Sequence, residues 1–522
     1  MKILRRGVLA LGCAIALVTA ASAQTRTLVV AASGTPEGFD GDALRPHTQE
    51  TVVQAYDPLV AYARTKDAQG REILDSSRIE PNLAESWAID ADGKRYVFKL
   101  RPGVKSARGN ELTAADVEWS WAKSFAQKRT GNFIASVSSV TAVKALSKYE
   151  VEFTLSAPSS ILLKALTLYV PGIYDTAEVK KHATSEDPWA LKWLETNTAG
   201  FGPYNVESVR SGEQAVFVAN PNYFKGAPYF GRVVYRAVPS GANRVTLLKS
   251  GQVQWIERPN ILQVEDLKKD RRVKVDSTDG RLFAALWMNT KFEPYKDIRV
   301  RQALNYAVDR DALLTAVFRG EAVPAKTFIA PSIDGQDPSF FEFKHDPATA
   351  KRLLAEAGHA GGLQVEILYS DIYWWLEAMA IQVADQLKAV NVTATPKRIT
   401  ASDMRAAFAP NRRDMPFFAW EDGPLVLDGG YAAFLLLHSQ GAANRFGYVN
   451  ADVDALVLQI RQELDVARRN GLLKELQRKV MADSPWILTF YPTLFEAMAP
   501  NIIGWVSYPD DHERWAELRE QR

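Results

Sequence analysis

Apolar and polar positions follow two different periods along this chain, and segments of the two kinds interleave from near its start to its end. Residues Thr27 to Ala32 form a short apolar run that predicts a buried strand. Turn-forming residues follow from Ser33 to Phe39. In this order an open α/β sheet presents a ligand loop at the end of a strand.

The most regular pattern lies between Asn82 and Lys123. Two runs of alternating residues flank a tight turn at Asp90–Gly93 and predict a hairpin, with apolar positions at Trp87, Ile89, Tyr96, Phe98 and Leu100. A helix is expected next, with Thr113 as its N-cap and Asp116 at its third position. Apolar residues then recur every four positions, which predicts one buried helix face formed by Val117, Trp121 and Phe125.

Later segments continue the interleaving. A turn is expected at Gly200–Tyr204, and Asp297–Asp309 carries apolar residues at helical spacing after an apolar strand. Asp346-Pro347 predicts the start of a helix over Ala348–Ala357, which Gly358 closes. Because strands and helices alternate throughout, we predict an α/β protein.

The first 23 residues have the pattern of a secretory signal. Basic residues precede an apolar stretch from Gly7 to Ala21, and Ala21-Ser22-Ala23 ends it, so we expect cleavage after Ala23. The stretch is shorter than the roughly 20 residues that span a membrane, which disfavours an uncleaved anchor. A lipid anchor at Cys13 is a further alternative, but we expect a soluble, exported protein.

Composition narrows the classes of function. Cys13 is the only cysteine, so the 499 residues left after cleavage have no disulfide and need cores of two or three lobes for stability. Cleavage also removes three basic residues and no acid, which leaves 60 basic and 61 acidic residues. This balance gives no general attraction to nucleic acid, so we expect no nucleic-acid partner.

No reaction site is evident in the sequence. It has no nucleophile elbow, no paired-histidine metal motif and no phosphate-binding loop. The histidines are isolated, at His47, His182, His345, His359, His438 and His512. We therefore expect no enzyme, no cofactor and no metal centre.

Five segments in a fixed order resemble one protein family. They are Leu83–Val104, Leu112–Val117, Gly200–Tyr204, Asp297–Arg310 and Asp346–Gly358. The chain is similar, from about Thr27 to Trp505, to the peptide and nickel class of periplasmic solute-binding proteins, particularly the dipeptide- and oligopeptide-binding members. It departs from their pattern at Ser106-Ala107-Arg108, before the loop glycine.

The resemblance implies a periplasmic, monomeric receptor of an ABC importer, with two hinged lobes that close on a peptide and deliver it to a permease with ATPase subunits. It places the first lobe at 25–55, 200–275 and 490–522. It also implies an inserted subdomain at 56–199 and a second lobe at 276–489.

Two candidate ligand segments follow from the resemblance. The loop of Ser33, Gly34 and Thr35 is similar to a first-lobe ligand loop, although turn formation alone explains these residue types. After the strand that contains Trp420, an acid in relatives holds the ligand ammonium, and the candidates are Glu421, Asp422 and Asp428. Asp422 is the first choice and Asp428 the second; a solvated loop acid is the alternative.

A third candidate segment is aromatic. We expect one of Tyr373, Trp374 and Trp375 to face the cleft, with the others in the core. Relatives carry a carboxylate-binding Arg near here, but residues 369–377 contain no Arg or Lys, and the sequence does not place Arg405, Arg412 or Arg413. An amine-bearing small molecule therefore fits as well as a dipeptide. A nickel chelate, with His438 nearby, is the alternative within the family.

Overall fold

The computed structural model describes residues 26–43, 45, 47–67, 70–278, 280–409 and 411–521. The expected signal sequence, its cleavage site at Ala23 and the cysteine at position 13 lie outside these ranges. Within them, none of the helices combines the length and the apolar character needed to cross a bilayer.

The first lobe is built on a seven-stranded sheet. Its strands, in spatial order, are β12 (Lys274–Thr278), β19 (Leu494–Met498), β11 (Trp255–Ile256), β1 (Thr27–Ala32), β10 (Arg232–Ala237), β9 (Gln214–Ala219) and β8 (Tyr204–Arg210). The predicted buried strand over residues 27–32 is confirmed as β1, which pairs in parallel with β10 and β11 in the middle of the sheet. Its helices are α1 (Gln49–Val52), α6 (Gly241–Lys249) and α7 (Ile261–Leu267).

The second lobe is built on a six-stranded sheet. Its strands, in spatial order, are β14 (Val323–Pro324), β18 (Trp486–Tyr491), β13 (Phe283–Met288), β17 (Phe417–Asp422), β15 (Leu363–Tyr369) and β16 (Val392–Arg398). The central strand β13 is buried at all six positions. Its helices are α8 (Ile298–Ala307), α9 (Arg310–Phe318), α10 (Pro347–Glu356), α11 (Trp374–Leu387), α12 (Ala401–Ala407), α13 (Gly429–Leu437), α14 (Ala451–Gln462) and α15 (Val466–Asp483).

An inserted subdomain carries a third sheet, whose order is β4 (Ala84–Ile89), β5 (Arg95–Leu100), β7 (Glu150–Leu155) and β6 (Val140–Ala145). The predicted hairpin is confirmed as β4 and β5, in which Trp87 lies opposite Phe98. The remaining elements here are β2 (Val60–Lys66), β3 (Glu72–Pro81), α2 (Ala114–Gln127), α3 (Thr130–Val137), α4 (Leu162–Ala165) and α5 (Thr176–Val179). A last pair, β20 (Ile502–Ile503) and β21 (Arg519–Glu520), closes the chain.

The predicted helix starts are confirmed by their caps. Asp116 accepts the backbone N–H of Thr113 at 2.8 Å, which forms the expected capping box at the start of α2. The Asp346 side chain accepts the N–H of Thr349 at the start of α10, and Gly358 follows that helix with a φ of 90°. Local side-chain chemistry therefore fixes these ends.

Glycines allow close backbone packing at two joints. A Cβ at Gly200 would lie 2.0 Å from the carbonyl oxygen of Ala55, so the expected turn at 200–204 needs a residue without a side chain. A Cβ at Gly280 would lie 2.0 Å from the carbonyl oxygen of Pro492. Gly280 and Pro492 lie in the two short connections between the lobes, β12 to β13 and β18 to β19, which pack tightly against each other at the hinge.

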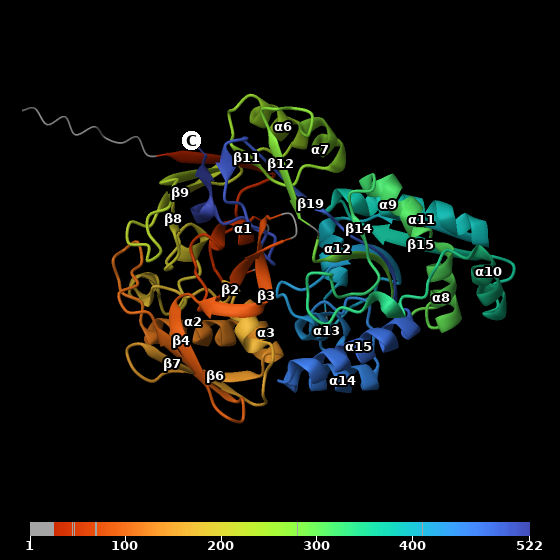
Figure 1. The fold of residues 1–522 in the computed structure, drawn as a ribbon, viewed down its shortest axis with the longest axis horizontal. Coiled ribbons are helices and arrows are strands. Elements are labelled where there is room, and N and C mark those ends of the chain that lie inside the picture. Colours follow the sequence, from red (N-terminus) through yellow and green to blue (C-terminus); the bar gives the residue numbers. More distant parts are fainter. Residues whose placement is uncertain are drawn as a thin grey trace, which may run out of the picture.

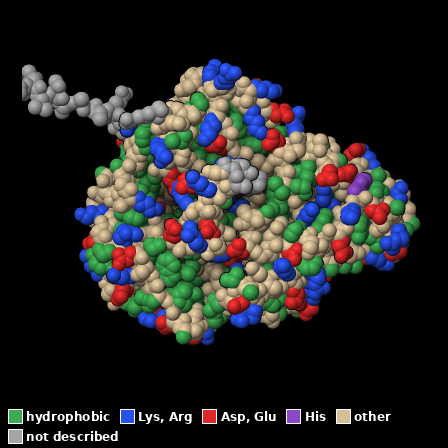
Figure 2. All heavy atoms as spheres, in the orientation of Figure 1, with side chains coloured by type: hydrophobic (Ala, Val, Ile, Leu, Met, Phe, Trp, Pro, Cys, Tyr) green, Lys and Arg blue, Asp and Glu red, His purple; other side chains and the backbone are tan. Residues whose placement is uncertain are grey.

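The two lobes lie side by side, with the inserted subdomain below the first lobe in the view of Figure 1. They touch away from the hinge connections, because α3 of the inserted subdomain contacts α13 of the second lobe and the rings of Phe133 and Tyr431 are 6.4 Å apart. The chain is therefore in a closed arrangement. Figure 2 shows positive and negative side chains mixed over the visible face, as the near-neutral composition predicts.

Candidate ligand-binding site

A cavity of about 900 Å³ lies between the lobes. The first lobe contributes residues after β1 and β11, the inserted subdomain contributes α3 and the segment after α4, and the second lobe contributes β17 and its neighbours. The C-terminal segment at 510–512 forms another part of the wall. A cleft with walls from every subdomain is the usual place for a ligand in a hinged protein.

The loop after β1 contributes one of its three candidate residues to the cavity. Ser33 lines it, and its hydroxyl lies 3.4 Å from Nε2 of His47. A Cβ at Gly34 would lie 2.7 Å from the His47 ring, so Gly34 permits this histidine to pack on the loop. Thr35 accepts a hydrogen bond from the N–H of Gly212 at 3.0 Å and is absent from the lining.

Trp420, Glu421 and Asp422 all line the cavity from the end of β17. Asp422, the first-choice anchor, already has a cationic partner, because Nε of Arg445 lies 2.6 Å from its carboxylate. The Arg445 guanidinium also lies over the ring of Phe408, 4.6 Å from its centroid. The charge of Asp422 is thus balanced within the second lobe before any ligand arrives.

Glu421 has no such partner. Its side chain is 4% exposed, and one carboxylate oxygen makes no hydrogen bond. Burial raises the pKa of Glu421 well above its ordinary value, and the charges of Asp511 and Asp422 raise it further against the opposing effect of Arg258. Burial therefore disfavours the ionised form of Glu421, and an adjacent cation would favour it.

Asp428, the second-choice anchor, does not line the cavity. It is fully buried, caps α13 by accepting the N–H of Tyr431 at 2.9 Å, and forms ion pairs with Arg469 and with Lys164 at 3.3 Å. Burial alone would raise the pKa of Asp428, but Arg469 and Lys164 outweigh it and lower the pKa. The expectation that Asp428 faces a ligand is therefore corrected: it holds a helix start and a contact between lobes.

One of the three candidate rings lines the cavity. Tyr373 does so, and it stacks on Trp375 with centroids 5.0 Å apart. Trp375 is buried, with 5% of its surface exposed. Trp374 packs on Phe318 with centroids 4.9 Å apart. Trp374 and Trp375 thus support the wall that Tyr373 presents.

The structure brings a cation into the cavity that sequence reasoning missed. Arg258 follows β11, adopts a φ of 42°, and lines the cavity with an exposed side chain. Its guanidinium donates a long hydrogen bond, at 3.4 Å, to the carbonyl oxygen of Asp511, and it has no ion pair within the described ranges. The surrounding protein disfavours the charged form of Arg258, but the nearby acids Glu50 and Asp511 outweigh this effect and raise its pKa. Arg258 is a charged group available for a carboxylate.

Three more lining residues carry polar atoms without hydrogen-bond partners. They are Oε2 of Glu50, the hydroxyl of Tyr169 and both ring nitrogens of His512. Tyr169 and His512 are 5% and 6% exposed, so water cannot satisfy them freely. Sequence reasoning missed these residues because they come from α1, the segment after α4 and the C-terminus, which only the fold brings together.

Residues that the sequence left unplaced fall in different regions. Arg405 lines the cavity, whereas Arg412 pairs with Asp414 and Arg413 donates to the carbonyl of Ser439. His438 stacks on Phe434 and is absent from the lining. Among the described residues, no group of His, Cys, Asp and Glu side chains is arranged to hold a metal ion.

Comparisons with known proteins agree with this architecture. The profile for "Bacterial extracellular solute-binding proteins, family 5 Middle" matches residues 78–444. The chain is 26% identical to Heme-binding protein A of Haemophilus influenzae, over 94% of this chain and 91% of that protein. It is 25% identical to the Dipeptide-binding protein of Escherichia coli K12, over 97% of both. These relatives are named as binding proteins.

Solved structures share the fold. The periplasmic binding protein DppA from Helicobacter pylori, in complex with the peptide STSA, superposes with a TM-score of 0.82 at 20% identity, over 95% of this chain and 98% of that one. NikA from Brucella suis, in complex with Fe(III)-EDTA, also gives 0.82, at 21% identity, over 95% of this chain and 100% of that one. The two-lobed fold with an inserted subdomain is therefore confirmed.

Proposed function

The chain belongs to the bacterial extracellular solute-binding proteins of family 5, and from this premise we propose that it captures a peptide or another amine-bearing small molecule between its lobes for an ABC importer. The observation that supports this most is the 900 Å³ cavity in which Arg258 and Glu421 both lack ion-pair partners. A ligand with a positive and a negative end would satisfy both groups.

The two charged groups suggest an orientation for the ligand. The ammonium group lies against Glu421, with Asp422 adjacent, and the carboxylate lies against Arg258 in the first lobe. Tyr373 and Trp420 supply ring faces to the part of the ligand between them. Because its ends contact different lobes, the ligand binds the closed form more tightly than the open form and favours closure.

The cellular role is that of an exported receptor. The protein acts outside the cytoplasm as a monomer, after removal of the signal sequence, and passes its ligand unchanged to a transmembrane permease with ATPase subunits. The names of the relatives as binding proteins support a role without chemical conversion.

The test compares one peptide with its capped forms. We expect isothermal titration to show that N-acetylation and C-terminal amidation each weaken binding about tenfold or more, because each removes the ligand charge that pairs with Glu421 or with Arg258. In Arg258→Gln, amidation should no longer matter; in Glu421→Gln, N-acetylation should no longer matter.

The matched control is Arg412→Gln, which removes an exposed guanidinium outside the cavity. It should bind all three peptide forms like the unchanged protein. Peptides that bind with the same affinity whether or not their ends are capped would contradict the proposed orientation.

A metal chelate is the second candidate, and His512 is the observation that favours it. This histidine lines the cavity with both ring nitrogens unpartnered, in contrast to His438. Elemental analysis after purification from nickel-containing medium distinguishes the two. Stoichiometric nickel that is lost in His512→Gln would favour the chelate over the peptide.

A further inference from the structure

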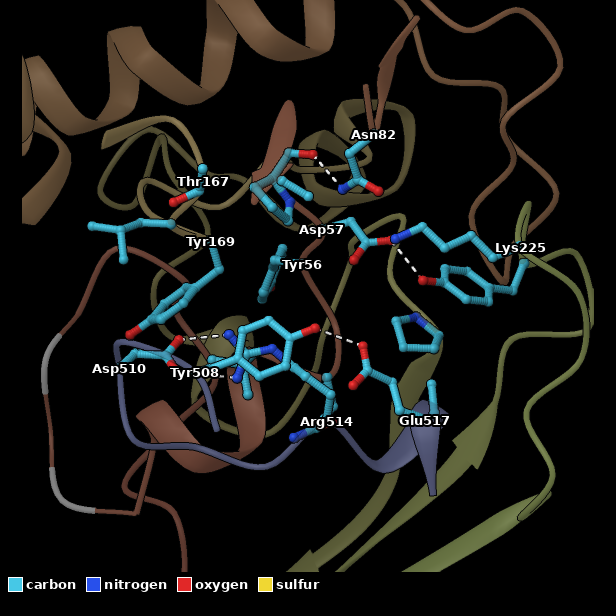
Figure 3. Close-up of a pocket in the computed structure, with 18 of the residues that line it drawn as sticks. Tyr56, Asp57, Asn82, Thr167, Tyr169, Lys225, Tyr508, Asp510, Arg514 and Glu517 are labelled. Carbon is cyan, nitrogen blue, oxygen red and sulfur yellow. Dashed lines mark hydrogen bonds and ion pairs between the residues drawn. The ribbon is translucent and has the colours of Figure 1, made fainter. Parts of the chain in front are cut away.

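A second cavity, of about 200 Å³, lies where the first lobe, the inserted subdomain and the C-terminal segment meet (Figure 3). Leu168, Tyr169 and Asp510 line both this cavity and the larger one, so they form a wall between them. Its volume equals that of about seven water molecules at roughly 30 Å³ each. The cavity is large enough for a small organic molecule.

Tyrosine rings form much of the lining. Figure 3 shows the rings of Tyr56, Tyr169 and Tyr508 around the cavity, and Tyr62 and Tyr223 complete the set. Tyr56, Tyr62 and Tyr169 are 0%, 7% and 5% exposed. Faces of aromatic rings attract cations, and several rings around one space form a cage for them.

The three carboxylates of the lining differ in whether a cation is paired with them. Asp510 is paired with Arg514 at 2.6 Å, and Glu517 is paired with Arg64, so these two carboxylates have cations. Asp57 is 9% exposed and accepts one hydrogen bond, from the Tyr223 hydroxyl at 2.9 Å, but it has no ion pair in the described part of the chain. A buried carboxylate without a cation is costly unless a ligand supplies one.

Two orphan atoms in the lining are acceptors. Asn82 is 2% exposed and donates through Nδ2 to the Pro58 carbonyl at 2.7 Å, which leaves Oδ1 without a partner. Oε2 of Glu517 is buried and also has no partner. Both atoms could accept a hydrogen bond from the N–H group of a ligand.

We propose that this second cavity is a binding site for a small organic cation with N–H donors, such as a primary ammonium or a guanidinium. The cation lies among the tyrosine rings, its charge faces Asp57, and its N–H groups donate to Asn82 and Glu517. The site is independent of the proposed peptide cavity, because none of these three acceptors lines that cavity.

The mouth of the cavity lies at exposed residues 225–227. In Figure 3 the Lys225 side chain extends from this mouth toward Asp57, without forming an ion pair within the described residues. Lys225 is therefore a built-in competitor for an external cation. Its removal should strengthen binding of the cation, an effect that a purely structural role for Asp57 would not produce.

The test uses three probes of similar size, followed by ligand-observed NMR titration of the purified protein. Butylammonium carries charge and N–H donors, tetramethylammonium carries charge alone, and 1-butanol is neutral. We expect affinity to decrease in that order. Asp57→Asn should weaken butylammonium about tenfold or more, because it removes the buried charge but keeps the shape of the side chain. Lys225→Met should strengthen it.

Two further variants locate the binding. Glu421→Gln, in the larger cavity, should leave the Asp57-dependent binding unchanged, so failure of this site and failure of the proposed peptide site are distinguishable. Ala227→Trp places a bulky ring at the exposed mouth and should reduce butylammonium binding without a change in thermal unfolding, even if Asp57→Asn fails to fold.

Two results would overturn the proposal. One is equal affinity for butylammonium and 1-butanol. The other is butylammonium binding that persists in both Asp57→Asn and Ala227→Trp. The cation would then bind elsewhere, and the cavity would hold only water.

Discussion

Glu421 and Asp422 are neighbours in sequence, yet their surroundings give them different roles. Asp422 is held by Arg445 at 2.6 Å, whereas Glu421 has an unpartnered oxygen and a pKa raised by burial and by Asp511 and Asp422. A cationic ligand gains more from the second group than from the first, because the first charge is already balanced.

Proton release tests this difference. Because burial raises the pKa of Glu421 and an ammonium ligand would lower it, ligand binding should release a proton from Glu421 at pH values between the two pKa values. We expect affinity for an amine-bearing ligand to rise with pH while the amine stays protonated. Isothermal titration in buffers of different ionisation enthalpy measures the released proton, and Glu421→Gln should abolish the release.

Without ligand, the stability of the protein should depend on pH in the opposite direction. A carboxyl group whose folded pKa is raised contributes stability below its unfolded pKa and loses it as pH rises through the folded pKa. Glu257, with a pKa raised to about 8 chiefly by burial, acts in the same direction as Glu421. Melting temperature should therefore fall as pH rises from about 4.5 to above 8, and ligand should reduce the fall. If Glu421→Gln released as many protons on ligand binding as the unchanged protein, the proposed role of Glu421 would be contradicted.

Sequence reasoning reached part of this site. Trp420 and Tyr373 line the cavity at the ends of elements that the pattern located, because a strand end faces the cleft. The choice between Glu421 and Asp422 depends on Arg445, which is distant in sequence from both. Arg258 escaped notice because its position in the cavity depends on a positive φ and on the packing of the lobes. Such contacts are tertiary, so a local pattern in the sequence cannot predict them.

At the scale of elements, Asp428 links the start of α13 to another helix of the second lobe and to the inserted subdomain. It caps α13 and pairs with Arg469 of α15 and Lys164 of the inserted subdomain. Removal of its carboxylate leaves two cations near a buried site and an uncapped helix.

We expect Asp428→Ala to lower the free energy of unfolding by about 3 to 5 kcal/mol, with ligand affinity changed little in protein that remains folded. Urea denaturation measures the first quantity, and titration at low temperature measures the second. The control is Asp452→Ala, which removes an exposed carboxylate from the first turn of α14 and should cost less than about 1 kcal/mol. Selective loss of affinity with normal stability would instead restore Asp428 as a ligand contact.

Elements with strong local signals were predictable from sequence, and their connections were less so. The caps at Thr113 and Asp346 and the hairpin turn at 90–93 identified α2, α10, β4 and β5, because short-range hydrogen bonds fix them. The turn at Gly200 was visible, but its cause was not: the glycine is required by the carbonyl of Ala55, far away in sequence. Packing between segments decides such positions.

At the scale of the whole molecule, contacts across the cleft hold the lobes together. The N–H of Leu427 donates to the Tyr62 hydroxyl at 3.0 Å, Lys164 donates to the carbonyl of Leu427 at 3.3 Å, and Phe133 packs on α13. These contacts are partly polar, as expected where opening must be possible. The ligand would add contacts on both sides of the same cleft and so favour the closed form.

Native mass spectrometry of the gently purified protein, followed by identification of whatever unfolding releases, tests the central claim most directly. We expect one amine-bearing molecule per chain, recovered chemically unchanged, and no such adduct in the double variant Arg258→Gln, Glu421→Gln. An adduct that persists in the double variant, a stoichiometric metal ion in place of an organic molecule, or a chemically altered ligand would contradict the account.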